Sequence, residues 1–371
     1  MIVEVIRSGD HSNTASHSPA ARPPAGAVQF GLAYGDTLFG KSTAQIRTEL
    51  ADVSDTGASW ARVDLAWIDI QPQSAAGYDW TPFDTIVRVA RQLHVHLLVT
   101  VGYTPAWARP SGCSVSGCAP ADPKTFAAFA RAAAARYDGI AAWEIWNEPN
   151  TPGFWAPHPD ADAFSTLVTD AAAAIRSQRP DATVVSGGLA ATTSANGAID
   201  TRAFLRQMCR DGVNKVVDAI GYHPYTYPYL ASYQASFGTA WNKIAATPQS
   251  FESVLRDAGT AQLPIWATEY GAPTGGPGAL SDGTSPIPAG TDHVTDGLQA
   301  SIASDSVTAA LGTRGIGALF WYSDRDEPGT SNVDHYGLRD VNGQKKPSYS
   351  GWQRAVRRAS ADASLAPTPT K

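Results

Sequence analysis

Two glutamates stand where apolar segments end, a placement that suggests chemistry. Glu148 ends the segment AAWEIWNE, and Glu269 ends the segment IWATE. An ionised carboxylate is costly to bury without partners, so glutamates at such positions point to a reactive site. Glycosidic cleavage needs two carboxyl groups that flank the bond. One protonates the leaving oxygen, and the other attacks the anomeric carbon or activates water.

The elements that would position these glutamates are short apolar strands that recur about every 40 residues, a spacing that accommodates one strand–helix unit. Helical segments separate them, which predicts a parallel sheet, and eight units can close into a (β/α)₈ barrel. The eight predicted strands are Val28–Tyr34, Trp60–Trp67, His96–Val101, Ala141–Trp146, Thr183–Gly187, Val217–Tyr222, Ile265–Glu269 and Ala318–Tyr322.

The helical segments show apolar spacing on one side, and the first one begins with a capping-box pattern, Ser42 followed by Gln45. The predicted helices are Ser42–Thr56, Phe83–Leu93, Thr125–Tyr137, Asp160–Arg179, Thr201–Asp211, Phe251–Ala258, Thr295–Gly312 and Lys346–Arg358.

A single catalytic barrel over residues 27–358 is therefore expected. Residues 1–26 read as a disordered linker, and residues 359–371 read as a flexible tail. Two long segments, 225–250 and 271–294, are expected to wall a cleft.

Active groups of such barrels lie at the C-terminal ends of the strands. Glu148 and Glu269 fall on the fourth and seventh strands, which places them opposite one another across the mouth. Strand alternation puts Glu144 on the same side as Glu148. We expect Glu144 to anchor Arg62 or another basic group inside the barrel.

The segment WEIWNEPN resembles the Asn-Glu-Pro motif of the clan of retaining (β/α)₈ glycosidases, clan A, which includes cellulases, mannanases, β-galactosidases, β-xylosidases and α-L-iduronidase. The resemblance implies that Glu148 is the general acid/base and that Asn147 binds the sugar 2-hydroxyl. It also implies that Glu269 is the nucleophile, so that bond cleavage proceeds by double displacement with retention.

Further site residues follow from the same resemblance. Arg62 matches an arginine that bonds the nucleophile, His223 and Tyr225 match a His-x-Tyr pair, and Trp321 matches a sugar platform. The segment YTPAWA, with Tyr103 and Trp107, is similar to the loop after the third strand in enzymes near glycoside hydrolase family 39. The resemblance therefore gives seven candidates for substrate binding, namely Arg62, Asn147, His223, Tyr225, Trp321, Tyr103 and Trp107.

Charge and hydropathy argue against nucleic acid and membrane as partners, and the resemblance implies a carbohydrate substrate. The formal net charge is -6, and the basic residues form no dense block beyond Arg354, Arg357 and Arg358, which argues against nucleic acid. No stretch approaches about 20 apolar residues, so no membrane span is expected. Neither a cofactor nor a metal is expected, and the oligomeric state is not encoded in any pattern we can read.

Three cysteines bear on the compartment. Cys113 and Cys118 can close a small ring in a Ser/Gly/Pro-rich loop, which would indicate an oxidising environment. Residues 1–26 contain no apolar stretch typical of a signal peptide. We expect a secreted or cell-envelope protein, with a cytoplasmic one as the alternative.

Other interpretations compete with a hydrolase. A transglycosylase would use the same site with a sugar as acceptor, and a catalytically silent barrel would only bind carbohydrate. The segment Gly35–Ser42 fits the phosphate-loop pattern, but Leu38 and Phe39 are bulky where amides would wrap phosphate. An acidic group, Asp324, Asp326 and Glu327, could bind calcium or a cationic sugar, although we expect a solvated loop.

Overall fold

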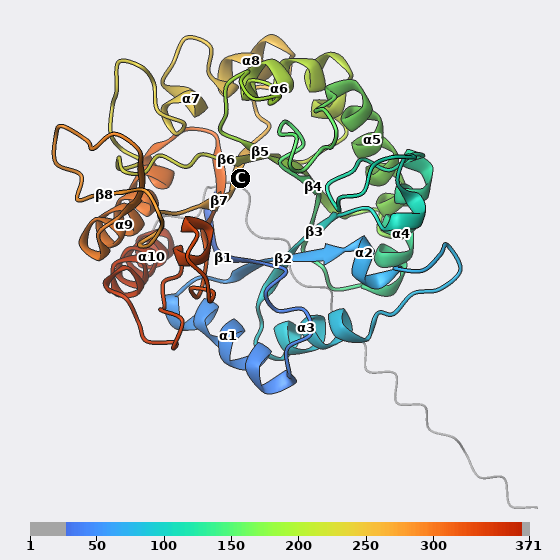
Figure 1. The fold of residues 1–371 in the computed structure, drawn as a ribbon, viewed down its shortest axis with the longest axis horizontal. Helices are drawn as coiled ribbons and strands as arrows, with labels where there is room; N and C mark the ends of the chain where they lie inside the picture. Colours follow the sequence, from blue (N-terminus) through green and yellow to red (C-terminus); the bar gives the residue numbers. More distant parts are fainter. Residues whose placement is uncertain (1–26, 366–371) are drawn as a thin grey trace, which may run out of the picture.

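The computed structural model describes residues 27–365 and shows a closed barrel of eight parallel strands (Figure 1). Around the ring the order is β1-β10-β7-β6-β5-β4-β3-β2, and β10 pairs with β1 to complete the closure. The strands are β1 Gln29–Gly35, β2 Trp60–Ala66, β3 His96–Gly102, β4 Ala142–Asn147, β5 Thr183–Ala190, β6 Ile220–His223, β7 Ile265–Tyr270 and β10 Ile316–Tyr322. The predicted (β/α)₈ fold is confirmed.

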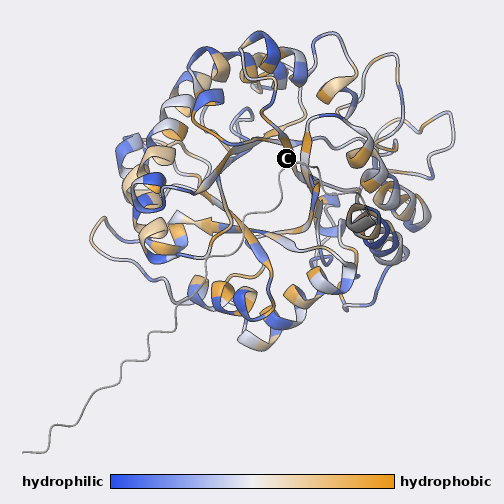
Figure 2. Cartoon of the chain, turned by 180° about the vertical axis from the view of Figure 1, so that it is seen from behind, coloured by the Kyte–Doolittle hydropathy of each residue, from blue (hydrophilic) through white to orange (hydrophobic). Residues whose placement is uncertain are grey.

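Helices surround this ring and cover the outer faces of the strands (Figure 1). In α3 the buried side chains recur at helical spacing, which gives the helix one apolar face for the barrel. Figure 2 shows the apolar colour concentrated on the strands and on the helix faces that meet them. The main helices are α1 Thr43–Thr56, α3 Thr81–Gln92, α4 Pro123–Arg136, α5 Ala161–Gln178, α6 Thr201–Arg210, α8 Phe251–Asp257, α9 Asp296–Gly312 and α10 Pro347–Leu365.

The barrel interior is filled by its own apolar cluster, separate from the layer between strands and helices. Trp60 and Trp266 meet edge to face, with ring centroids 5.6 Å apart, near the N-terminal ends of β2 and β7. Phe320 joins them from β10. Since these rings plug the bottom, polar side chains that face the axis gather at the opposite, C-terminal mouth.

Several details differ from the sequence-based expectation. Trp67 begins a short helix, α2 Trp67–Ile70, instead of ending the second strand. The segment after β7 forms a small parallel sheet of β8 Ala279–Ser281 and β9 Thr291–Val294. A second short helix is α7 Asn242–Ala245, and 3₁₀ turns occur at Ala106–Ala108, Val213–Lys215 and Asn332–His335.

The predicted C-terminal boundary at residue 358 is wrong, because α10 continues to Leu365. Trp352, Val356 and Ala359 remain buried along one side of this helix, so its apolar face extends past the boundary. The predicted linker, 1–26, and residues 366–371 of the predicted tail lie outside the described residues. Within the described part of the chain, no helix has the length and apolarity of a membrane span.

The phosphate-loop pattern is a strand–helix connection. Ser42 caps α1 in a capping box with Gln45, as predicted. The amides of Thr37 and Phe39 bond to carbonyl groups within the same turn, and Lys41 forms an ion pair with Glu49 at 2.9 Å. These groups are therefore already used within the fold.

Candidate active site

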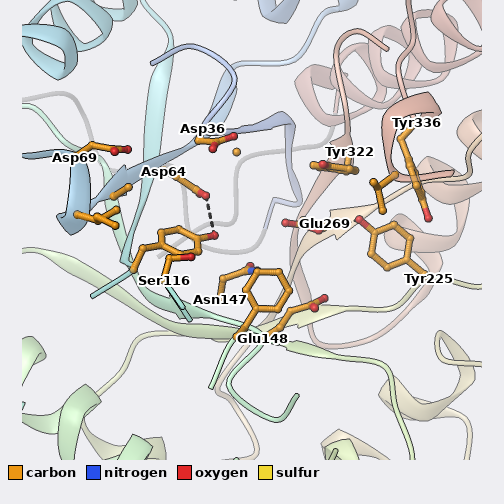
Figure 3. A pocket seen from close by; sticks show the side chains of 16 residues that line it. Asp36, Asp64, Asp69, Ser116, Asn147, Glu148, Tyr225, Glu269, Tyr322 and Tyr336 are labelled. Carbon is orange, nitrogen blue, oxygen red and sulfur yellow. Dashed lines mark hydrogen bonds between the residues drawn. The ribbon is translucent and has the colours of Figure 1, made fainter. Parts of the chain in front are cut away.

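A cavity of about 550 Å³ opens at the C-terminal mouth of the barrel. Figure 3 shows Asp36, Asp64 and Asp69 on one side of it and Tyr225, Tyr322 and Tyr336 on the other, with Glu269 between them. Asn147, Glu148, Tyr103, Ser116 and Phe154 complete much of the lining. The cavity therefore has an acidic wall and an aromatic wall.

Arg62 organises the floor of this cavity from β2. Its side chain is 1% exposed, and Nε donates to Glu144 Oε2 at 2.6 Å. Nη1 donates to Glu269 Oε1 at 2.6 Å, and Nη2 donates to Asn147 Oδ1 at 2.8 Å. A planar guanidinium can serve several acceptors at fixed angles, so one residue orients three strand-end side chains. Thr100 also donates to Glu144, at 2.8 Å, and Glu144 thus anchors Arg62 as expected.

Glu269 is held as a carboxylate. Burial by itself would raise its pKa, but His223 and Arg62, together with a hydrogen bond from Tyr225, lower it below its usual value. The Tyr225 hydroxyl donates to Oε2 at 2.8 Å, so each oxygen of Glu269 has a strong donor. Donors to the charged form favour ionisation. The group is thereby prepared to act as a nucleophile or as a base.

Glu148 lies directly after β4, and His223 connects it with Glu269. The His223 Nδ1 atom is 2.9 Å from Glu148 Oε1 and 3.5 Å from Glu269 Oε2. Burial would lower the pKa of His223, but the carboxylates of Glu269 and Glu148 outweigh it and raise the pKa. A proton on Nδ1 is therefore favoured. One atom from each of the three residues lies within 4.8 Å of the others.

The backbone is strained where these side chains emerge. Tyr103, Trp146 and Glu148 have φ values of 66°, 75° and 44°, in the left-handed region that non-glycine residues rarely adopt. They lie at the C-terminal ends of β3 and β4, and the rings of Tyr103 and Trp146 are stacked with centroids 6.5 Å apart. Such strain persists where the surrounding structure imposes it, often at functional sites.

Besides Arg62, three predicted substrate-binding residues do not line the cavity. Trp321 is fully buried, donates from Nε1 to the Tyr336 carbonyl, and packs against Trp352 of α10. The prediction of Trp321 as a sugar platform is wrong, because its side chain points away from the barrel axis. Trp107 donates to the Gln71 carbonyl and packs edge to face on Trp67, so it supports the loop.

The third residue, His223, is also fully buried, and both its ring nitrogens are engaged. Nε2 is 3.1 Å from Thr268 Oγ1 while Nδ1 faces Glu148. The prediction of direct sugar contact by His223 is therefore wrong. The ring positions Glu148 from below. In contrast, Asn147, Tyr103 and Tyr225 line the cavity. Arg62 is buried and donates hydrogen bonds to two of the lining residues, Asn147 and Glu269.

Sequence reasoning missed several lining residues. Tyr322 faces the cavity one position after Trp321, and Tyr336 reaches it from the loop after β10. Apart from Tyr225, neither of the two long segments expected to wall the cleft contributes to the lining. Asp64 carried a signal, since it follows Arg62 by two residues and shares its face of β2.

The structure bears on two alternatives from the sequence, a metal site and a solvated acidic loop. Glu148, His223 and Glu269 offer the ligand types of a divalent cation site. In this structure His223 and Glu148 are within hydrogen-bond distance of each other, and Glu269 accepts a hydrogen bond from Arg62. The acidic segment after β10 is not a solvated loop, which corrects the expectation. Asp324 and Asp326 are buried, and Asp326 forms an ion pair with Lys346 at 2.8 Å.

A disulfide joins Cys113 and Cys118 in the loop between β3 and α4. Thr104 donates to the Cys118 carbonyl at 2.6 Å, and Thr104 N–H donates to the Ser116 carbonyl at 3.1 Å. Ser116 lines the cavity. The bridged loop is thus fastened to the end of β3 and supplies part of the wall.

Comparison with known proteins places this site in context. The family model described as Cellulase (glycosyl hydrolase family 5) matches residues 25–306. The comparison with curated proteins finds no match.

Among solved structures, a family 39 glycoside hydrolase from the gut symbiont Bacteroides cellulosilyticus WH2 is similar, with a TM-score of 0.66 at 20% identity. The alignment covers 89% of this chain and 63% of that one, so the chain spans less than two thirds of the relative.

Two further structures have the same fold. A GH5_18 protein from Streptomyces cattleya, in complex with GlcNAc, gives a TM-score of 0.65 at 18% identity, covering 93% of this chain and 82% of that one. A GH39 β-xylosidase from Caulobacter crescentus gives 0.59 at 18% identity, covering 90% and 72%.

Proposed function

This chain belongs to the cellulase family, glycosyl hydrolase family 5, and from that premise we propose that it is a retaining β-glycosidase with Glu269 as nucleophile and Glu148 as general acid/base. Membership of this family supports a glycoside hydrolase activity on a carbohydrate substrate. The stereochemical course and the roles of the two glutamates are our inference from the geometry.

The separation of the two carboxylates carries this proposal. An oxygen of Glu148 and an oxygen of Glu269 lie within 4.8 Å of each other at the edge of the same cavity. Retaining glycosidases place their carboxyl groups about 5–5.5 Å apart, whereas inverting ones leave about 6.5–9.5 Å for a water molecule. The close approach favours direct attack by a carboxylate.

The contacts around the two carboxyl groups support a different role for each. Arg62 and Tyr225 keep Glu269 ionised and fix both its oxygens, which suits attack on the anomeric carbon. Glu148 has a side chain that is 20% exposed and can reach the leaving oxygen to donate its proton. Glu148 then removes a proton from the water that releases the sugar from Glu269.

Asn147 completes the floor with a defined orientation. Arg62 can only donate hydrogen bonds, so the amide oxygen of Asn147 must face it. The amide NH₂ group is thereby left to donate to a sugar hydroxyl beside the scissile bond. This contact can tighten as the ring approaches the transition state.

Covalent trapping tests the nucleophile. A 2-deoxy-2-fluoro glycoside with a good leaving group should label Glu269, and a peptide map should locate the sugar there. Glu269→Gln should lower kcat by more than about 10³-fold and abolish labelling. Inverted anomeric configuration in the first product, followed by NMR, would contradict the proposal.

Glu148→Ala tests the acid/base role with a different signature. Substrates with poor leaving groups should lose about 10²–10⁴-fold in rate, since proton donation is removed. Aryl glycosides whose leaving group needs no proton should retain their glycosylation rate. Equal losses on both substrate classes would argue against Glu148 as the proton donor. Product analysis with added sugar acceptors separates hydrolysis from transglycosylation.

The disulfide supports a proposal about location. A bridge between Cys113 and Cys118 is favoured in oxidising compartments and rare in the cytosol. We infer that the protein works outside the cytoplasm, secreted or at the cell envelope. Thiol counting on protein taken from its native source should find only Cys209 reactive, whereas three free thiols would indicate a reducing compartment.

A further inference from the structure

Asp64 is the acidic residue that lies deepest in the acidic wall of the cavity. It lies on β2 two residues beyond Arg62, so its side chain shares the inward face and sits one step nearer the mouth. Asp64 is 7% exposed and lines the cavity. Figure 3 shows it on the opposite side of the cavity from Tyr322.

The hydrogen bonds of Asp64 are incomplete. Its Oδ2 accepts from the Tyr103 hydroxyl at 3.0 Å, while Oδ1 is buried and has no partner among the described residues. Arg62 donates hydrogen bonds from Nε, Nη1 and Nη2 to other acceptors. Asp64 therefore lies near a cation that is already committed elsewhere.

A purely structural role explains this arrangement poorly. A buried carboxylate with an unpaired oxygen destabilises the fold, and native structures contain few such groups. Tyr103, which holds the carboxylate, is itself kept in the left-handed region with φ of 66°. Two unfavourable features therefore converge on one pair of side chains at the cavity wall, which is typical of a group shaped for a ligand.

The charge of the lining indicates what kind of ligand fits. Five carboxylates line the cavity, and none of its lining residues within the described chain is Lys, Arg or His. An anionic sugar, such as a uronic acid, would be repelled by this wall. A neutral sugar ring carries hydroxyl groups that can donate to a carboxylate, which is the partner that Oδ1 lacks.

We propose that Asp64, presented by Tyr103, is a specificity-determining residue that accepts a hydrogen bond from one ring hydroxyl of a neutral sugar. The proposal rests on the glycosidase function proposed above. Because Arg62 links Glu269 to the same strand, the bound hydroxyl would also help fix the ring over the nucleophile. Burial raises the pKa of Asp64 to about 6, and Arg62 and Tyr103 offset only part of that effect, so a donor from the sugar would favour the ionised form.

A double-mutant cycle between protein and substrate tests this proposal. Wild type and Asp64→Ala are assayed on an aryl glycoside and on its mono-deoxy analogues. Wild type should lose about 10- to 100-fold in kcat/KM on one analogue, the one lacking the hydroxyl that Asp64 binds. For Asp64→Ala, kcat/KM on the full glycoside should already be lower than the wild-type value by that factor. Its kcat/KM on that analogue should then equal its kcat/KM on the full glycoside. The corresponding aryl uronide should be a poorer substrate than the neutral glycoside.

Two controls keep the outcomes distinct. Asp257→Ala, whose side chain is 77% exposed on α8, should leave kcat/KM unchanged. Tyr103→Phe should weaken the same hydroxyl discrimination as Asp64→Ala but by a smaller factor. Thermal unfolding checks that each variant is folded. If Asp64→Ala lowers kcat/KM equally on the glycoside and all its analogues, or on none of them, the inference about Asp64 is overturned. Covalent labelling of Glu269 would still support the proposed function. If wild type cleaves no glycoside, the proposed function fails with it.

Discussion

Among single residues, Arg62 has the most consequential contacts in the site. It neutralises Glu144 and Glu269 while turning Asn147 toward the cavity. Removing one partner from a buried ion pair is far more harmful than exchanging the whole pair for apolar groups, because the remaining charge stays unpaired. The neighbouring Asp64 shows the opposite situation, a buried charge without a committed cation.

The pH dependence of the unfolding free energy should reveal the ionisation of Asp64. Its pKa is about 6 in the folded protein, above the ordinary value of 3.8, so the folded state holds the proton more tightly than the unfolded state. The destabilisation from ionising Asp64 is therefore absent below about pH 4 and complete above about pH 6. Asp64→Asn should raise the unfolding free energy at pH 7 by up to about 3 kcal/mol.

Urea denaturation of wild type and Asp64→Asn at several pH values measures this difference. The gain should shrink toward zero as the pH falls to 4. A gain of the same size at pH 4 and pH 7 would show that it does not come from ionisation. A loss of stability at pH 7 would show that Asp64 is satisfied in the folded protein.

Between elements, glycines in β5 set how closely the strands and their side chains approach. A Cβ atom at Gly188 would lie 2.1 Å from His223 Nε2 and 2.8 Å from Thr268 Oγ1. A Cβ atom at Gly187 would meet the Ile145 carbonyl oxygen at 2.6 Å. The Ser-Gly-Gly segment thus provides the space in which His223 lies beneath Glu148.

Gly188→Ala should therefore displace His223 and loosen Glu148. We expect kcat/KM to fall by roughly tenfold or more, and the unfolding free energy to fall by about 1–3 kcal/mol through overpacking. Steady-state kinetics and urea denaturation measure the two effects.

Gly297→Ala is the matched control, because a Cβ atom at this exposed position of α9 meets nothing within 4 Å. It should keep its activity and gain up to about 1 kcal/mol from the higher helix propensity of alanine. Unchanged kinetics in Gly188→Ala would show that the position of His223 does not matter for catalysis.

At the scale of the whole molecule, a buried polar network fastens the seam where the barrel closes. Asp52 of α1 accepts hydrogen bonds from Arg339 Nε and Nη2, both at 2.6 Å. The Tyr349 hydroxyl of α10 donates to the same carboxylate at 2.8 Å. Residues from the first helix, the last helix and the loop after β10 are thereby joined beside the β1–β10 pair.

Asp52→Asn should weaken this closure. Its side chain is 3% exposed, and the change removes the carboxylate that forms the ion pair with Arg339. We expect the unfolding free energy to fall by about 3 kcal/mol or more. Glu252→Gln, which breaks an exposed pair with Arg314, should change it by less than about 1 kcal/mol. Equal effects of the two changes in urea denaturation would contradict a special role for the seam.

The amino-acid sequence alone determined the barrel and the two glutamates that meet at its mouth. Eight apolar strands with helices between them leave few other folds. Glu148 and Glu269 could be predicted as partners because strand ends meet at one mouth. Arg62 and Tyr225 could be assigned near them only through a resemblance, and their roles in catalysis remain predictions.

Tertiary structure alone decided which side chains face the cavity. Parallel strands are apolar on both faces, so alternation does not reveal whether Trp321 or Tyr322 points inward. Packing of Trp321 against α10 settles that choice. Tyr336 arrives from an irregular loop, for which no pattern predicts direction. The unpaired oxygen of Asp64 depends on where β4 and β7 place the acceptors of Arg62, and such contacts exist only once the barrel has closed.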